Sequence, residues 1–286
     1  IAIAANWQYL GRIFQPPFTA GGKEANTLKI ATYNVDSFGN EQSGYSCKEI
    51  AAYMKEHRVD IICFQEFAGN RYFTPDSIRN AFADWQYAVI PQAPDSTPIL
   101  QVALFSKYPV KDSRLITYPD SRNCSMWCDL DIDGQTIRVF NNHLQTTEVS
   151  QNKRRLEREL AKNELTGREK AVARQLLEGL NENFRKRAAQ AKTLEQLIRT
   201  TPYPILVCSD FNSLPSSYTY STVKGDNLQD GFQTCGHGYM YTFRYFKRLL
   251  RIDYIFHSKE FKGVDYYSPD LDLCSDHNPV VMEVKM

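Results

Sequence analysis

Short apolar runs that stop at a carboxylate, amide or imidazole residue are the feature of this sequence that most constrains its fold. The run 61–64 leads into Glu66, and the run 205–208 leads into Asp210. Apolar runs of this length, bounded by polar residues, are typical of buried strands. Strand ends on a common sheet edge form a mouth where a rigid scaffold positions reactive groups. The pattern therefore predicts a layered domain with a polar site at one edge.

Strand patterns recur along most of the chain. They cover residues 28–34, 61–64, 100–106, 113–118, 124–132, 136–142, 204–208, 251–257, 261–267 and 279–284. Helical spacing covers 47–57 with Ser46 as N-cap, 74–82 with Pro75 in the first turn, and 151–199 with Gly167 separating two helices. Helices alternate with strands at both ends, and strands dominate the middle. This order predicts an α/β domain with mixed or antiparallel sheets instead of a simple doubly wound fold.

The length and the N-terminal segment predict one domain preceded by an arm. The 286 residues suit a single large α/β domain, which we place at residues 28–286. Residues 1–27 contain Pro16-Pro17 and Gly21-Gly22 and are interpreted as an arm or linker. They are either an ordinary arm packing on the domain or the stub of a membrane segment. No apolar run of transmembrane length occurs, so membrane contact is expected only if a segment upstream of Ile1 supplies it.

Charge and cysteine usage narrow the function classes. The formal net charge is +1, so no global basic field indicates nucleic acid. Residues 151–199 carry 13 Lys and Arg against 7 Asp and Glu, which suits either a polyanionic substrate or a solvated helix face. The seven cysteines include no CxxC pair. This usage predicts neither a zinc site nor a full disulfide framework, which favours a reducing compartment such as the cytoplasm.

Eight polar residues at predicted strand ends are candidates for chemistry. They are Asn34, Glu66, His143, Asp210, Asn212, Asp253, Asp276 and His277. Each alone has an ordinary explanation, because Glu66 could cap a helix, Asp210 could form an Asx turn and His143 could be a core histidine. Their joint occurrence in this order is much harder to explain by chance. Carboxylate oxygens suit Mg²⁺ or Mn²⁺.

Six blocks together resemble the endonuclease/exonuclease/phosphatase superfamily, whose members include DNase I, sphingomyelinases and CCR4-type deadenylases. The blocks are Thr32-Tyr33-Asn34, Gln65-Glu66, Asn141-Asn142-His143-Leu144, Ser209-Asp210-Phe211-Asn212, Arg251-Ile252-Asp253-Tyr254 and Ser275-Asp276-His277. The resemblance covers residues 28–286 and implies a DNase I-like four-layer sandwich, with two central mixed or antiparallel sheets flanked by helices. Two positions depart from the family pattern, since Ser209 stands where Gly is common and Asn142 where Thr is common.

The resemblance implies a role for each candidate residue. Glu66 would be the principal ligand of Mg²⁺ or Mn²⁺, with Asn34 and Asp276 near the metal or its waters. His277 would contact the scissile phosphate or act as base, and Asp253 would fix its tautomer. The remaining residues would serve the water, the phosphate and the leaving oxygen. Asp210 would orient or deprotonate the attacking water, Asn212 and Arg251 would bind phosphate, and His143 would assist the leaving oxygen.

Three alternatives remain for the activity and its substrate. Residues 210–217 and 252–259 are similar to the CCR4-type nuclease branch, so a phosphodiesterase of nuclease type leads. A phosphatase or phospholipase C-like enzyme acting on a lipid or sugar phosphate is the second, and an inactive phosphate-binding module is the third. A phosphoester such as nucleic acid is the expected partner, and the sequence indicates no obligate protein partner. The aromatic and basic residues between 239 and 248 either stack bases and contact phosphates or pack the sandwich.

Overall fold

The computed structural model describes residues 27–93, 97–146 and 168–286, and in the first part of the last range, residues 168–177, it describes only the backbone. The predicted arm therefore lies almost wholly outside the described residues. The same holds for the first part of the predicted 151–199 helical stretch, including Gly167.

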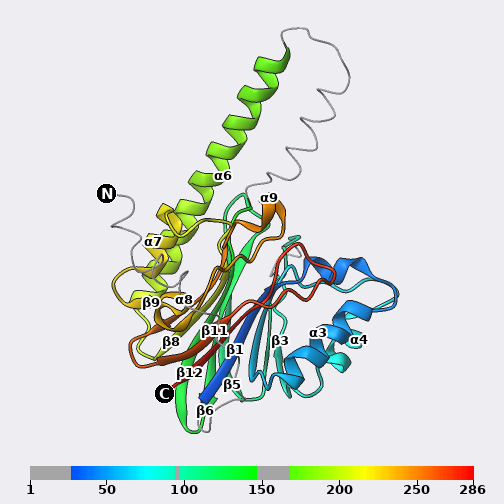
Figure 1. The fold of residues 1–286 in the computed structure, drawn as a ribbon, viewed down its shortest axis with the longest axis vertical. Helices are drawn as coiled ribbons and strands as arrows, with labels where there is room; N and C mark the ends of the chain where they lie inside the picture. Colours follow the sequence, from blue (N-terminus) through cyan, green and yellow to red (C-terminus); the bar gives the residue numbers. More distant parts are fainter. Residues whose placement is uncertain (1–26, 94–96, 147–167) are drawn as a thin grey trace.

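Two six-stranded sheets form the body of the molecule (Figure 1). The strand order of the first sheet is β11 (Lys262–Tyr267), β12 (Val280–Lys285), β1 (Thr27–Asn34), β2 (Ile61–Gln65), β4 (Ala103–Ser106) and β3 (Tyr87–Val89). The order of the second sheet is β5 (Val110–Thr117), β6 (Cys124–Ile132), β7 (Gln135–His143), β8 (Ile205–Asp210), β10 (Asp253–Ser258) and β9 (Leu228–Asp230). One pair in each sheet is parallel, β1 with β2 and β7 with β8, so both sheets are mixed.

Three separate apolar clusters show that the molecule has four layers. Side chains alternate between the two faces of a strand, so Leu28 and Ile30 of β1 enter the cluster between the sheets. Their neighbours Ala31 and Tyr33 enter a second cluster, which packs the first sheet against α3 (Tyr45–Glu56) and α4 (Pro75–Ala81). A third cluster packs the second sheet against α6 (Arg168–Arg199) and α7 (Tyr218–Lys224). The predicted four-layer sandwich is confirmed.

Helix boundaries follow local capping chemistry, with one difference from the prediction. Thr74 caps α4 by accepting a hydrogen bond from the Ser77 N–H, and Pro75 occupies the first turn as expected. The predicted cap Ser46 lies inside α3, because the helix begins two residues earlier, after Gly44. Gly44 adopts a φ of 64°, a left-handed conformation that glycine takes without strain.

Six short elements were not predicted from the sequence. They are the 3-10 helix η1 (Asp36–Asn40), β3, α7, β9, α8 (Gly231–Cys235) and α9 (Tyr245–Arg248). Among the described residues, no helix combines the length and the apolarity that crossing a membrane requires. The 32-residue α6 extends beyond the sandwich in Figure 1, and the short α9 (Tyr245–Arg248) lies near the base of that extension.

Candidate active site

Strand register brings the predicted residues to one edge of the sandwich. In the first sheet, Asn34 at the end of β1 pairs with Gln65 at the end of β2. In the second, His143 at the end of β7 pairs with Asp210 at the end of β8. β10 runs antiparallel to β8, so its first residue, Asp253, also pairs with Asp210. Two parallel strand pairs and one antiparallel strand therefore converge at a single mouth.

Three residues of this mouth adopt left-handed backbone conformations. The φ angles are 43° for Asp36, 50° for Glu66 and 49° for Asn212. Residues other than glycine rarely adopt this region, and Glu66 is the least expected of the three. Such conformations cost free energy and cluster at functional sites, where surrounding contacts hold them. They turn the chain directly after β1, β2 and β8.

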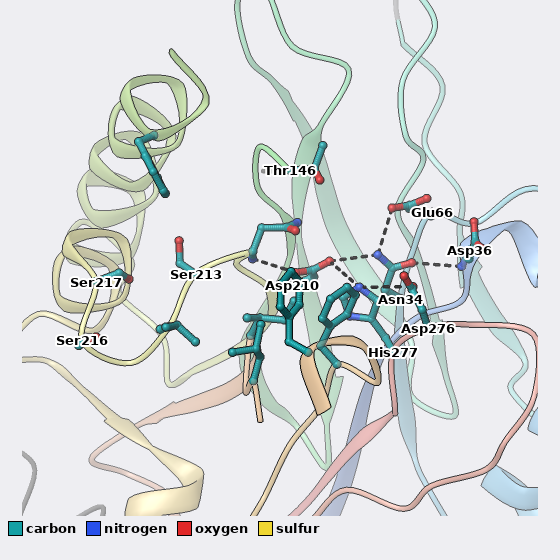
Figure 2. Close-up of a pocket in the computed structure, with 17 residues that line it drawn as sticks. Asn34, Asp36, Glu66, Thr146, Asp210, Ser213, Ser216, Ser217, Asp276 and His277 are labelled. Carbon is teal, nitrogen blue, oxygen red and sulfur yellow. Dashed lines mark hydrogen bonds and ion pairs between the residues drawn. The ribbon is translucent and has the colours of Figure 1, made fainter. Parts of the chain in front are cut away.

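Asn34 joins the two sheets across the mouth. Its amide Nδ2 donates to Glu66 Oε1 at 3.1 Å and to Asp210 Oδ2 at 3.0 Å. Its Oδ1 accepts from the backbone N–H of Asp36 at 3.1 Å. The dashed lines in Figure 2 connect these residues. In this arrangement Asn34 positions two carboxylates, and its contact with a metal remains a prediction.

Carboxylates gather beside Asn34, and within the described cavity wall His277 is the one basic side chain that faces them. Partial burial and repulsion from Glu66 and Asp276 raise the pKa of Asp36 to about 6. Burial also raises the pKa of Asp276, and the nearby carboxylates of Glu66 and Asp210 add to this effect. A set of hard oxygen donors that repel one another matches the ligand chemistry of Mg²⁺ or Mn²⁺. The carboxylates of Glu66, Asp276 and Asp36 therefore fit a divalent cation, and the ligand role of Glu66 and Asp276 stays a prediction.

His277 is paired with Asp253. Its Nδ1 lies 2.9 Å from Asp253 Oδ2 and 3.1 Å from Oδ1, while Nε2 lies 3.8 Å from Asp210 Oδ2. Burial disfavours the charged ring, but the carboxylates of Asp253 and Asp210 outweigh it and raise the pKa of His277 to about 10. Asp210, Asp253 and His277 lie close enough together to hold a cation, but the Asp253 carboxylate already occupies His277 Nδ1. We interpret this trio as a proton-bearing group.

His143 lies beneath the cavity and is fully buried. Its Nε2 is 3.5 Å from Glu66 Oε1 and 3.6 Å from Asp210 Oδ2, and neither ring nitrogen makes a hydrogen bond with the described residues. The ring is not part of the described cavity wall, but it approaches two carboxylates that are. The predicted contact of His143 with a leaving oxygen stays a prediction.

A buried polar strip of α6 supports the loops that follow the strands. Asn183 accepts from Gln145 Nε2 at 3.3 Å, and Gln190 accepts from the Gln145 backbone N–H at 2.8 Å. Between them, Arg187 donates from Nη1 to the backbone carbonyl of Asn212. Positions separated by three and four residues share one helix face. This face of α6 therefore holds the loops around the mouth.

Arg187 is a site residue that was not predicted from the sequence. It is fully buried, and its Nε and Nη2 make no hydrogen bond with the described residues. Burial lowers the pKa of Arg187 to about 10, and attraction to Asp210 opposes that shift. Its neighbour Asn212 lines the cavity, and the Asn212 amide donates to the Leu144 carbonyl at 3.2 Å.

The structure does not support the predicted phosphate-binding role of Arg251. The side chain is 1% exposed, and its two terminal nitrogens lie 3.1 Å from Asp230 Oδ1 and 2.6 Å from Oδ2. Its guanidinium also lies over the rings of Phe232 and Tyr254. These partners place Arg251 in the interior, outside the cavity wall, so we assign it a structural role.

The mouth opens into a cavity of about 580 Å³ (Figure 2). Its polar wall consists of Asn34, Asp36, Glu66, Asp210, Asn212, Asp276 and His277. The remaining wall was not predicted and consists of Thr146, Phe184, Ser213, Leu214, Ser216, Ser217, Phe243, Phe246, Leu250 and Ile252. In Figure 2, Ser213, Ser216 and Ser217 lie on the side of Asp210 opposite Glu66 and Asp36. The sequence analysis left open whether the aromatic residues between 239 and 248 contact a ligand or pack the sandwich. Two of them, Phe243 and Phe246, line the cavity.

The two departures from the family pattern contact each other. Asn142 and Ser209 are register partners on β7 and β8. The amide of Asn142 donates to Ser209 Oγ at 2.9 Å and to the Cys208 carbonyl at 3.1 Å. Both residues are fully buried beside the mouth. They therefore form a complementary pair that leaves the reacting groups in place.

Comparison with solved structures shows a shared fold. An endonuclease/exonuclease/phosphatase protein from Bacteroides vulgatus is 19% identical with a TM-score of 0.64, and the match covers 91% of this chain and 99% of that one. TDP2 from D. rerio, solved with a single-strand DNA product, is 15% identical with a TM-score of 0.64, covering 91% and 99%. The Bacteroides thetaiotaomicron mannosyl-6-phosphatase Bt3783 is 17% identical with a TM-score of 0.59, covering 91% and 100%.

No curated protein sequence matches this chain. A family model does match, over residues 31–277, which include every predicted site residue. The match covers most of the 286 residues, and it agrees with the four-layer fold and with the convergence of the six sequence blocks at one mouth. The chain belongs to the endonuclease/exonuclease/phosphatase family of phosphoester hydrolases.

Proposed function

We propose that this protein is a divalent-metal-dependent phosphodiesterase that cleaves a P–O bond by attack of water. The observation that carries this proposal is the composition of the cavity wall. Carboxylates that fit a cation line the cavity, and His277, which is paired with Asp253, lies 3.8 Å from both Asp210 and Asp276. A phosphate in this cavity would reach both kinds of group.

Glu66, Asp36 and Asp276 would hold Mg²⁺ or Mn²⁺. When bound, the cation supplies polarisation of a phosphoryl oxygen and neutralises charge on the leaving group. The protein's own contribution is to hold these residues in place, and Asn34 contributes by donating to the Glu66 carboxylate and by accepting from the backbone N–H of Asp36.

The remaining groups act on water and on the phosphate. His277 would donate from Nε2 to a phosphate oxygen, because Asp253 accepts from its Nδ1 and favours the charged ring. Asp210 would orient the attacking water and accept its proton. Its carboxylate lies between two imidazole rings, 3.8 Å from His277 Nε2 and 3.6 Å from His143 Nε2. Asn212 would hydrogen-bond the phosphate through its amide.

Charge favours a diester over a monoester. The described part of the cavity wall contains four carboxylates, Asp36, Glu66, Asp210 and Asp276, and no lysine or arginine. A phosphodiester carries one negative charge, whereas a phosphomonoester near neutral pH carries up to two. Within the described wall, His277 is the one side chain that can offset the carboxylates. The wall therefore repels a singly charged diester less than it repels a doubly charged monoester. A nuclease is one form of this activity.

Hydrolysis of model esters tests the proposal. We expect bis(p-nitrophenyl) phosphate to be hydrolysed with Mg²⁺ or Mn²⁺, more efficiently than p-nitrophenyl phosphate, and not after chelation with EDTA. Glu66→Gln should lower the rate by about 10²-fold or more, the scale on which directly acting groups contribute. The matched control is Glu49→Gln, because Glu49 is exposed on α3 away from the cavity.

Each outcome has a consequence for the proposed activity. Metal-independent turnover, or turnover retained in Glu66→Gln, would overturn the assignment. Preference for the monoester would replace the phosphodiesterase with a phosphatase. A single-stranded oligonucleotide assayed in parallel tests the nuclease form, which TDP2, solved with a DNA product, makes worth examining.

A further inference from the structure

The second half of the cavity differs chemically from the catalytic half. Phe184 comes from α6, Leu214 from the loop after β8, and Phe243 and Phe246 from the segment before β10. Phe184 is 54% exposed and Phe246 is 46% exposed. Large apolar side chains that are left in solvent around a cavity mark a binding surface for an apolar group.

The aromatic side chains of this half are continuous with the catalytic centre. The Phe243 ring contacts the His277 ring edge-on, with a centroid distance of 5.1 Å. Phe246 stacks beyond Phe243 at 6.3 Å with an interplanar angle of 29°. A group attached to a phosphate at His277 therefore meets Phe243 first and Phe246 next.

The backbone holds Phe246 in an unusual conformation. Phe246, Lys247 and Arg248 all have positive φ, at 53°, 58° and 59°. Bulky residues in this region are strained, and such strain persists where surrounding contacts maintain it. The segment is closed at its base by a bridge between Phe243 and Leu250. This closed segment presents the Phe246 ring to the cavity.

Two basic residues of the same segment are paired away from the cavity. Arg244 contacts Asp270 at 2.5 Å and Asp272 at 2.8 Å, and Arg248 lies 3.6 Å from Asp270. Neither arginine is part of the described cavity wall. The segment therefore offers the cavity its rings, and its arginines neutralise nearby aspartates.

We infer that the subsite formed by Phe184, Leu214, Phe243 and Phe246 binds an uncharged ring carried by the ester group of the substrate. Ring-to-ring contact adds to the gain from apolar burial, which favours a flat ring over an alkyl chain. The hydroxyls of Ser213 and Ser216 can bond a polar ring substituent. The substrate class is a phosphodiester with one reacting phosphate beside an aryl or nucleobase ring. This inference rests on the proposed phosphodiesterase activity.

Binding of small phosphonates tests the subsite without requiring turnover. Calorimetry in Mg²⁺ compares methylphosphonate, phenylphosphonate and 3-phosphonopropionate on the intact protein. We expect phenylphosphonate to bind at least about tenfold more tightly than methylphosphonate, which corresponds to ~1.4 kcal/mol. The carboxylate of 3-phosphonopropionate should give no such gain, because the wall is acidic.

Phe246→Ala should reduce the phenyl preference to less than about threefold while leaving the affinity for methylphosphonate unchanged. Tyr72→Ala is the matched control, since Tyr72 is an exposed aromatic residue outside the cavity wall, and it should keep the full preference. Equal affinity for the methyl and phenyl ligands in the wild-type protein would overturn the inference. So would a phenyl preference that survives in Phe246→Ala.

Hydrolysis of bis(p-nitrophenyl) phosphate on the same preparation reports on the activity separately. A phenyl preference without turnover would retain the ring subsite and remove the proposed reaction. Turnover without a phenyl preference would retain the proposed reaction and remove the ring subsite. A nucleoside 5′-methylphosphonate, compared with phenylphosphonate, then distinguishes a nucleobase from a simple aryl group as the natural ring.

Discussion

Replacing Arg251 with methionine separates a structural arginine from a phosphate ligand. Methionine keeps apolar contact with Phe232 and Tyr254 but leaves the Asp230 carboxylate buried without its guanidinium. Removing one partner of a buried ion pair costs about 3–5 kcal/mol of unfolding free energy. Asp230 keeps two donors, the Tyr220 hydroxyl and the Phe232 backbone N–H. We therefore expect the lower end, about 3 kcal/mol.

The reverse exchange completes a double-mutant cycle. Asp230→Asn leaves the buried guanidinium without a carboxylate and should also cost about 3 kcal/mol. The double variant removes both charges, so its cost should fall at least about 2 kcal/mol below the sum of the single costs. Independent costs would mean that the two side chains do not interact as the structure shows.

Urea unfolding followed by circular dichroism at 25 °C measures these free energies. Turnover of bis(p-nitrophenyl) phosphate on the folded Arg251→Met protein should stay within about threefold of wild type, because the side-chain partners of Arg251, which are Asp230, Phe232 and Tyr254, do not line the described cavity wall. A stability loss below about 1 kcal/mol, together with a rate loss of about 10²-fold, would refute the reasoning and restore Arg251 as a phosphate ligand.

Three further predictions concern other buried polar groups. Burial lowers the pKa of His257 below its ordinary 6.5, so the unfolded chain takes up the proton first as the pH falls. Stability should therefore be lost below about pH 6.5. His257→Asn should reduce this loss, measured as the difference in unfolding free energy in urea between pH 7.5 and pH 5.5. An equal difference in both proteins would contradict the prediction. Arg187→Met frees the Asn212 carbonyl and should lower kcat, by up to about 10²-fold if the loop shifts by 1 Å; an unchanged kcat would show that the loop holds without the arginine. Asp253→Asn removes the partner charge of His277 and should lower kcat by about 10²-fold or more; a wild-type rate would remove the pair from the reaction.

Much of the fold was predictable because most strands combine apolar runs with clear ends. The structure places β2 and β8 where the runs 61–64 and 204–208 predicted buried strands. The three-residue strands β3 and β9 escaped prediction because so short a segment has too few positions to show alternation. α3 begins earlier than expected, because Gly44 occupies the N-cap position that was predicted for Ser46.

The site was predictable where a reactive residue ends or begins a strand, as Asp210 and Asp253 do. Asp36 was missed because it lies in a left-handed turn after β1, where no periodic pattern applies. Arg187 was missed because an arginine on a charged helix resembles a solvated residue, and only packing shows that it is buried. The role of Arg251 was wrong because it precedes β10, so strand register does not fix its direction.

The central claim is that the carboxylates around Glu66 hold the divalent cation of a phosphodiesterase. Calorimetric titration of Mn²⁺ into wild type, Glu66→Gln and the exposed control Glu49→Gln at pH 7.5 tests it without a substrate. The account predicts that wild type and Glu49→Gln bind Mn²⁺ with equal affinity and that Glu66→Gln binds at least about tenfold more weakly. Equal Mn²⁺ affinity in all three proteins, or no Mn²⁺ binding in wild type, would contradict it.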